Sequence, residues 1–259
     1  MPHPVTDSVT AITADAIARI EARLPGYLEG MYLHGSLCWG EFFAGSDIDF
    51  VATTSRRPNP TDLAVLQQVH RELDTGGRAF DGFYLPTAQL AEDPSTLAVH
   101  PGVLNGHFEV GHHGDAHQAT WHELAERGIT MHGPDVRELE IFTSQEVLEL
   151  NTRTNLEGYW LPRREKLRQG AAHGAPESVE WNVLGILRLH HVLLEHAITS
   201  KSGAGRWGRS VVAPEHGPII DEALSWREQQ RTTEQFAGDA RRQEATASLM
   251  DAVLAAHDL

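Results

Sequence analysis

The stretch LHGSLCWGEFFAGSDIDFVATT (residues 33–54) determines how the first half of the chain is expected to fold. One strand ending near Gly35 and another beginning at Asp47 can lie side by side in a sheet. Side chains two residues apart point to the same face of a strand, so Asp47 and Asp49 would lie together while Ile48 faces the core. The stretch therefore predicts a pair of carboxylates at one end of a sheet.

Paired carboxylates of this kind are typical of a magnesium site. Two like charges this close are costly without a cation between them, and Mg²⁺ usually shares its oxygen ligands with substrate phosphates. Gly35 would let a phosphate approach the backbone, and the hydroxyl and amide of Ser36 would bind phosphate oxygens. Taken alone, Asp47 and Asp49 are more typical of residues that cap a turn before a strand. The whole pattern favours a site for a metal and a phosphate.

A third carboxylate, Asp81, lies in the otherwise apolar run RAFDGFYLP (residues 78–86), which is typical of a strand. A carboxylate in such a run needs a partner or a function. Two-metal phosphoryl transfer uses a third carboxylate to bind the second metal or to take the proton from the attacking hydroxyl. Asp81 is therefore a candidate metal ligand and the candidate catalytic base.

The pattern of elements predicts an α+β protein with two domains. The first half alternates helices and strands, which indicates a mixed sheet with helices. Helices are expected at 8–24, 61–73 and 116–128, and strands at 31–35, 48–54 and 78–86. From Thr143 the pattern is helical, with helices expected at 176–199, 215–237 and 239–257. We therefore expect a sheet domain over 1–142 and a helical domain over 143–259.

Histidines gather in one segment that this pattern does not assign. They stand at 100, 107, 112, 113, 117 and 122, at spacings that fit no common zinc pattern. We interpret the segment as a polar loop or the lining of a substrate channel. The lone Cys38 excludes an internal disulfide, and we expect it to be a small buried residue rather than a nucleophile.

Composition indicates a globular protein. The 259 residues are 41% hydrophobic and 22% charged, with a net charge of −15. An acidic chain is a poor nucleic-acid binder; the charge favours a cationic ligand, or serves solubility alone. We find neither a signal-peptide pattern nor an apolar run of the ~20 residues that span a bilayer. These observations predict a cytoplasmic protein with no membrane or nucleic-acid partner.

Two motifs resemble a known family. The first stretch resembles the G-S-x10-D-x-D signature of the polymerase-β-like nucleotidyltransferases. The segment NVLGILRLHHVLLEHAITSKSGAGRW (182–207) resembles one in the aminoglycoside adenylyltransferases that modify streptomycin and spectinomycin. Its matching positions are Asn182, Arg188, Lys201 and Trp207. The resemblance runs from about residue 30 to 230. It implies a polymerase-β-like nucleotidyltransferase domain followed by an α-helical bundle.

The resemblance also implies a reaction, in which a substrate hydroxyl attacks the α-phosphorus of ATP, AMP is transferred and pyrophosphate leaves. Ser36 and Ser46 would contact the nucleotide phosphates. Asp47, Asp49 and Asp81 would hold Mg²⁺, with two ions expected. Asp81 stands where the family has a catalytic glutamate.

Two basic residues complete the implied nucleotide site. Arg188 and Lys201, from the helical domain, would reach the phosphates of ATP. The resemblance thus implies an active site between the two domains, with carboxylates on one wall and cations on the other.

The sequence leaves the acceptor open. The resemblance implies a small, cationic, hydroxyl-rich molecule bound by acidic and tryptophan side chains. The candidates are Glu109, Trp121, Glu177, Glu180 and Trp181. The alternatives are the acidic first turn of a helix for Glu177 and Glu180, and the core for the others. Spectinomycin is better supported than streptomycin, because the segment before Asn182 lacks the expected tryptophan and aspartate.

Two other functions stay open at this point. One is nucleotidyl transfer to a different small molecule, a protein side chain or a nucleic-acid end. The other is a degenerate fold that senses nucleotides or binds a partner.

Overall fold

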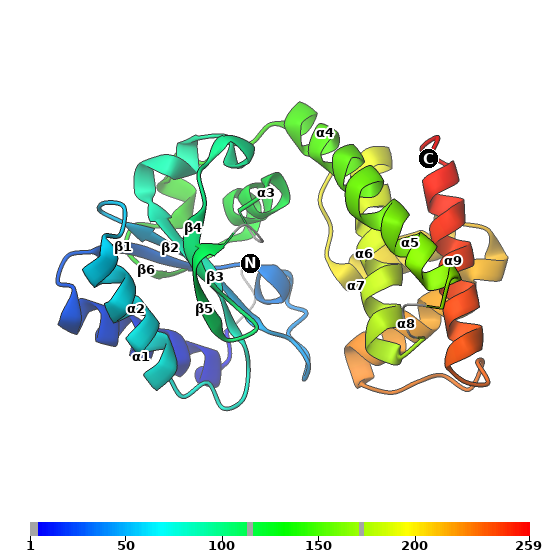
Figure 1. Cartoon of the computed structure of the whole chain (residues 1–259), viewed down its shortest axis with the longest axis horizontal. Helices are drawn as coiled ribbons and strands as arrows, with labels where there is room; N and C mark the ends of the chain where they lie inside the picture. Colours follow the sequence, from blue (N-terminus) through cyan, green and yellow to red (C-terminus); the bar gives the residue numbers. More distant parts are fainter. Residues whose placement is uncertain (1–4, 113–115, 171–173) are drawn as a thin grey trace. The chain divides into compact units, whose positions relative to one another are not determined.

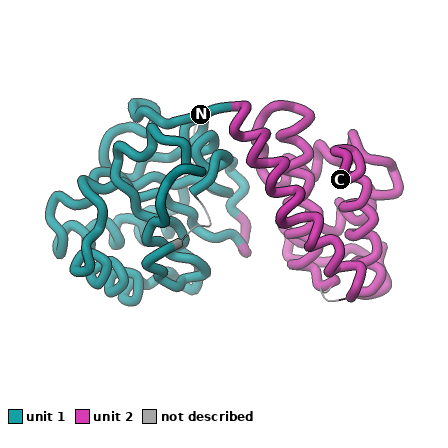
Figure 2. Tube along the Cα trace, turned by 45° about the horizontal axis from the view of Figure 1, so that its top comes forward, with its two compact units in different colours: residues 1–42, 46–144 teal, residues 43–45, 145–259 magenta. Residues whose placement is uncertain are grey.

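The computed structural model describes residues 5–112, 116–170 and 174–259 of the chain (Figure 1). They form two compact units, each with its own apolar core (Figure 2). The sheet unit comprises residues 1–42 and 46–144, and the helical unit comprises 43–45 and 145–259. No helix in the described ranges is long and apolar enough to cross a membrane.

The sheet unit is built on six strands in the order β5-β4-β3-β2-β1-β6. Their bounds are β1 Leu28–Leu33, β2 Ile48–Thr54, β3 Phe80–Pro86, β4 His100–Leu104, β5 His107–His112 and β6 Ile129–His132. Strands β2 and β3 run parallel and the other pairs are antiparallel. The prediction of a mixed sheet with helices is therefore confirmed.

Helices cover both faces of this sheet. Their bounds are α1 Asp7–Arg23, α2 Pro60–Glu72 and α3 Gln118–Arg127. Ile20 of α1 and Leu66 of α2 pack with Phe50 in one apolar cluster. Trp121 of α3 packs with Val51 in another. Because Phe50 and Val51 are neighbours on β2, their side chains point to opposite faces, so α1 and α2 lie on one face and α3 on the other.

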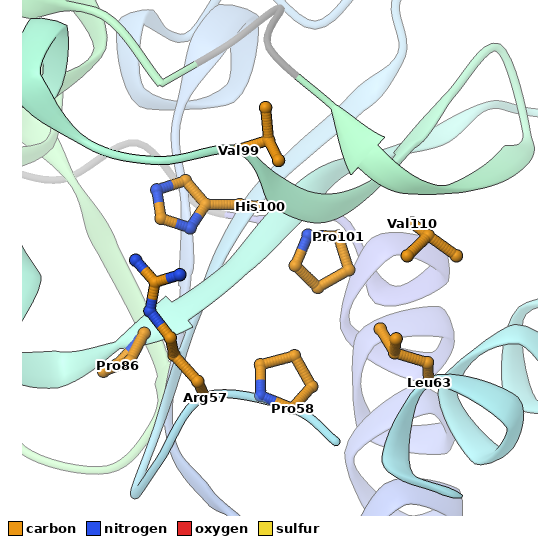
Figure 3. Close-up of a pocket in the computed structure, with 8 residues that line it drawn as sticks. All are labelled: Arg57, Pro58, Leu63, Pro86, Val99, His100, Pro101 and Val110. Carbon is orange, nitrogen blue, oxygen red and sulfur yellow. The ribbon is translucent and has the colours of Figure 1, made fainter. Parts of the chain in front are cut away.

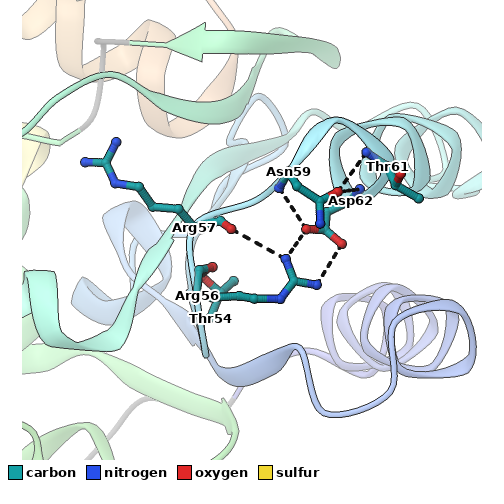
Figure 4. Close-up of polar contacts among 6 residues, drawn as sticks. All are labelled: Thr54, Arg56, Arg57, Asn59, Thr61 and Asp62. Carbon is teal, nitrogen blue, oxygen red and sulfur yellow. Dashed lines mark hydrogen bonds and ion pairs between the residues drawn. The ribbon is translucent and has the colours of Figure 1, made fainter.

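The start of α2 shows how local sequence sets this arrangement (Figure 4). Oδ1 of Asn59 accepts the backbone N–H groups of Thr61 and Asp62 at 2.9 and 3.1 Å. The carboxylate of Asp62 in turn accepts the Asn59 N–H at 2.8 Å, and Arg56 donates to it as well. The hydrogen bond from Arg56 lowers the pKa of Asp62. This capping box confirms the start of α2 predicted at Asn59 or Thr61.

Two segments of the sheet unit differ from expectation. The first strand ends at Leu33, and the Gly-Ser pair instead begins a short 3₁₀ helix, η1 (Gly35–Trp39). The histidine-rich segment forms the hairpin β4–β5 rather than a loop, because Asn105 and Gly106 take the positive φ angles of 51° and 74° that a tight hairpin turn requires. His113 lies outside the described residues.

The helical unit packs its helices around a single apolar core. Their bounds are α4 Gln145–Asn155, α5 Leu161–Arg168, α6 Pro176–Glu195, α7 Lys201–Val211, α8 Gly217–Gln229 and α9 Asp239–Ala255. A π-helical segment, Leu156–Trp160, joins α4 to α5, and the Leu161 N–H donates to the Leu156 carbonyl across it.

Helix α7 was not expected, because three glycines at 203, 205 and 208 disfavour a helix. Packing explains it. A Cβ at Gly205 would lie 2.8 Å from Leu184 Cδ2, and one at Gly208 would lie 2.8 Å from Leu187 Cδ1. The missing side chains therefore let α7 lie directly against the apolar face of α6, and this contact outweighs the poor helix propensity.

Candidate active site

Two of the predicted carboxylates meet on neighbouring strands. Asp49 on β2 and Asp81 on β3 are directly opposite each other in the parallel register. Their side chains therefore share the sheet face that also carries α3. Asp81 is 5% exposed, whereas Asp47 is exposed and lies one residue before β2 begins. The acidic pair with a defined register is thus Asp49 and Asp81.

Gly35 makes room for one member of this pair. Its φ is +60°, and a Cβ at this position would lie 2.0 Å from Asp49 Oδ2. Its amide N–H donates to Oε2 of Glu123 at 2.8 Å. The space beside Gly35 therefore holds the Asp49 carboxylate, and the Gly35 N–H is bonded to Glu123.

Glu123, which was not predicted, anchors this loop. It is 8% exposed and accepts hydrogen bonds from the Gly35 amide and the Trp39 indole N–H. Its Oε2 also lies 3.3 Å from Nδ1 of His34. The guanidinium of Arg127 lies 3.8 Å from the centre of the Trp39 ring. One buried carboxylate on α3 thus fastens both ends of the 3₁₀ helix that carries Ser36.

The two predicted serines have different surroundings. Oγ of Ser36 is buried and has no hydrogen-bond partner among the described residues, so it suits a ligand oxygen. The carbonyl of Ser46 accepts a hydrogen bond from Arg78 at 3.1 Å. Cys38 is buried, its thiol donates to the Gly35 carbonyl, and burial raises its pKa. A thiol in this state is a poor nucleophile, as expected.

Asp81 is held by the backbone of the β4–β5 turn. Its Oδ2 accepts the Asn105 N–H at 2.7 Å and its Oδ1 accepts the Gly106 N–H at 3.0 Å. Each carboxylate oxygen has more than one lone pair, so these bonds orient the group and leave it able to accept a proton or a cation.

These residues fit a magnesium ion that arrives with phosphates. Among the described residues, no three histidine, cysteine or acidic side chains converge on one point. Mg²⁺ needs no such cage, since it binds through one or two carboxylates together with substrate phosphates and water. Asp49 and Asp81 provide the two carboxylates, and the unpartnered hydroxyl of Ser36 can bind a phosphate that arrives with the ion.

The helical unit gathers the predicted basic residues. Lys201 is the first residue of α7, and Arg188 lies on α6. Oε1 of Glu180 lies 3.5 Å from Lys201 Nζ and 3.0 Å from NH1 of Arg227, a residue that was not predicted. Glu180, a predicted acceptor ligand, thus pairs with two cations in this structure.

The predicted tryptophans lie in opposite environments. Trp121 is 0% exposed, donates from Nε1 to the Leu90 carbonyl at 2.9 Å and stacks on Phe83. Its expected contact with the acceptor is therefore corrected to a role in the core. Trp181 is 46% exposed on α6, and its Nε1 donates to the hydroxyl of Tyr159 at 2.9 Å. Tyr159, in the π-helical segment, was not predicted.

The remaining acceptor candidates are exposed. Glu177 lies in the first turn of α6. Trp181 lies on the same helix, and Nζ of Lys201, from α7, lies 5.2 Å from the centre of its ring. Glu109 lies on β5, and the register places it on the sheet face that carries Asp81. Glu177, Trp181 and Glu109 are therefore all accessible to a ligand.

A pocket opens at the other end of the strands (Figure 3). It is lined by Arg57, Pro58, Leu63, Pro86, Val99, His100, Pro101 and Val110. Pro86 ends β3, whereas Asp81 lies near its beginning. With no carboxylate in its lining, this pocket is separate from the acidic pair.

The helical unit matches a known protein family. Residues 166–253 match the family described as aminoglycoside adenylyltransferase, C-terminal domain. The C-terminal part of the chain therefore matches the aminoglycoside adenylyltransferase family. The resemblance found in the sequence is thus confirmed, and the protein is an enzyme of the nucleotidyltransferase type.

A solved structure extends the likeness from this C-terminal match to the whole fold. The spectinomycin adenyltransferase AAD(9) from Enterococcus faecialis, crystallised with ATP and spectinomycin, superposes with a TM-score of 0.70 at 14% identity. The match covers 94% of this chain and 98% of the other. The predicted fold class is therefore confirmed. No curated protein sequence matches this chain.

Proposed function

We propose that this protein transfers AMP from ATP to a hydroxyl group of an aminocyclitol or aminoglycoside, with Mg²⁺ as cofactor. The observation that supports this most directly is the register of Asp49 and Asp81 on parallel strands, with the buried Ser36 hydroxyl in the loop packed against Asp49. The matching family and the ligands of AAD(9) point to the same nucleotide and to the same class of acceptor.

In this reaction the acidic residues have separate roles. Asp47 and Asp49 would hold Mg²⁺, with Asp81 as a further ligand, and the metal would neutralise phosphate charge. Asp81 takes the proton from the attacking hydroxyl, since the β4–β5 turn fixes the orientation of its carboxylate. The Ser36 hydroxyl donates a hydrogen bond to a phosphate oxygen. Ser46 lies in the loop between η1 and β2.

The basic residues of the helical unit serve the leaving group. Arg188 and Lys201 bind the phosphates that depart as pyrophosphate, because cations stabilise the charge that develops on them. On the acceptor, the exposed Glu177 and Glu109 suit ammonium groups and the Trp181 ring suits the apolar face of a sugar or cyclitol. This set favours a small cationic molecule rich in hydroxyl groups.

A pyrophosphate-release screen tests the proposal. The purified protein is incubated with ATP, Mg²⁺ and a panel of acceptors that includes spectinomycin and streptomycin. We expect release with at least one of them and none after chelation of Mg²⁺. Absence of release across the whole panel would reject this acceptor class, and release with another metabolite, a peptide or a nucleic acid would identify the alternative.

A further inference from the structure

The cationic cluster of the helical unit contains more than the two predicted basic residues. Three helices contribute to it: Glu180 and Arg188 come from α6, Lys201 from α7 and Arg227 from α8. Oε1 of Glu180 lies 3.0 Å from Arg227 NH1 and 3.5 Å from Lys201 Nζ. One carboxylate oxygen therefore serves two cations.

The balance of charge around Lys201 is positive. Burial lowers the pKa of Lys201, Glu180 raises it, and Arg227 and Arg188 lower it again. The charged groups that act on this lysine are thus one carboxylate and two guanidinium groups. Buried charge of one sign is costly unless opposite charge compensates it. The two guanidinium groups that act on Lys201 make its surroundings suited to an anion.

Arg227 has the properties of a phosphate ligand within this cluster. Its side chain is 10% exposed, and it lies in the last turn of α8, where the helix dipole favours a positive charge. A guanidinium carries five donors in a planar fork that matches phosphate oxygens. A long arginine on the surface would lose more conformational freedom on binding than one already held by Glu180.

We propose that Arg227 binds the polyphosphate of the nucleotide together with Arg188 and Lys201, and that Glu180 occupies two of these cations until phosphate displaces it. Glu180 holds the Arg227 and Lys201 side chains near each other before the nucleotide arrives, and its carboxylate then competes with phosphate for the same two cations. This inference rests on the proposed function, which names ATP as the ligand.

The alternative is that Arg227 exists only to neutralise Glu180 inside the helical unit. The two possibilities predict different anion affinities for Glu180→Gln. A purely structural pair gains no anion affinity when the glutamate is neutralised. A phosphate site gains affinity, because a competing negative charge has been removed.

Calorimetric titration of the full chain with inorganic tripolyphosphate, and separately with ATP, tests the inference. We expect Arg227→Gln to weaken both ligands on the order of tenfold to a hundredfold, as for a lost charged hydrogen bond. Arg227→Lys should fall between Arg227→Gln and the unmodified protein, since it keeps the charge without the fork. Glu180→Gln should bind tripolyphosphate severalfold more tightly. Arg209→Gln is the control, because this exposed arginine of α7 pairs with Asp221 and should leave both affinities unchanged.

Each result bears on one claim. Unchanged affinity in a folded Arg227→Gln, or in Arg227→Lys if the first variant does not fold, would overturn the inference. So would weaker tripolyphosphate binding by Glu180→Gln, or none by the unmodified protein. If tripolyphosphate binds and ATP does not, the anion site stands and the proposed nucleotide transfer falls.

Discussion

The sheet unit and the helical unit hold their charged groups by different means. Two backbone N–H groups orient Asp81, and the missing side chain of Gly35 gives Asp49 its place. In the helical unit, side chains from three helices meet, and one carboxylate holds Lys201 and Arg227. Backbone contacts leave a group few alternative positions, whereas long side chains can rearrange around a ligand. The difference indicates a rigid acidic site and an adjustable basic one.

The largest expected effect comes from the rigid site. Asp49→Asn should lower pyrophosphate release on the order of a thousandfold, because a neutral amide binds Mg²⁺ poorly. The temperature of unfolding should change little, since the amide has nearly the same shape. Asp15→Asn is the control, as Asp15 pairs with Arg19 on the surface of α1. Turnover that survives Asp49→Asn would contradict the assignment of a metal-binding role.

The next prediction concerns the space beside Asp49. Gly35→Ala should lower activity on the order of a hundredfold, because the new Cβ displaces the carboxylate by clashing with Oδ2. Gly76→Ala is a matched control: Gly76 has φ +61°, close to the +60° of Gly35, and nothing lies within 4 Å of its Cβ position.

Both glycine variants carry the same backbone strain, about 1 to 2 kcal/mol. Thermal unfolding should therefore show a loss of stability in both, while the assay shows a loss of activity in Gly35→Ala alone. Equal activity in the two variants would mean that the contact between Gly35 and Asp49 has no part in catalysis.

A smaller effect is expected at the anchor of the loop. The two oxygens of Glu123 accept from two different donors, Gly35 and Trp39, and glutamine has only one acceptor oxygen. Glu123→Gln should therefore destabilise the protein by about 1 to 3 kcal/mol and lower activity roughly tenfold. Glu126→Gln, on the same helix but half exposed, should do neither. Unfolding temperatures that are equal for the two variants would refute the anchoring role.

The smallest expected effect is the pH dependence of anion binding in the helical unit. Burial lowers the pKa of Lys201 below the 10.5 of an ordinary lysine. A bound anion favours the charged form, so tripolyphosphate affinity should fall severalfold as the pH rises through this lowered pKa. Lys201→Arg should remove the fall, because arginine stays charged. A pH profile of binding that is identical for both proteins would show that Lys201 is not a ligand of the anion.

Short-range signals predicted the parts of the fold that local physics determines. The strand at 48–54 has the predicted bounds, because an apolar run is flanked by turn residues. Helix α7 was missed because glycine gives a weak helix signal and packing decides its structure, whereas the β4–β5 hairpin was missed although Asn105-Gly106 is a local hairpin signal. Propensity alone does not report that packing.

The residues of the candidate site also divide into those that a local pattern predicted and those that only packing brings together. Asp49 and Asp81 were recognisable because each lies in a strand pattern of its own. Glu123 was not, since it reaches Gly35 across 88 residues and its neighbours in α3, His122 and Leu124, do not mark it as functional. Arg227 likewise meets Glu180 across 47 residues, through packing of helices that periodicity does not orient.

The π-helical segment 156–160 restricts the order in which mutations can accumulate in the helical unit. It ends two residues before Pro162, whose ring would collide with the carbonyl of residue 158 in an uninterrupted α-helix. The wider π turn avoids this collision and contains Tyr159 on the surface and Trp160 in the core. A lineage that lost one residue here would first need to replace Pro162, and only then could the shorter helix form without strain. A deletion in the π-helical segment is therefore expected only in relatives that lack a proline at position 162.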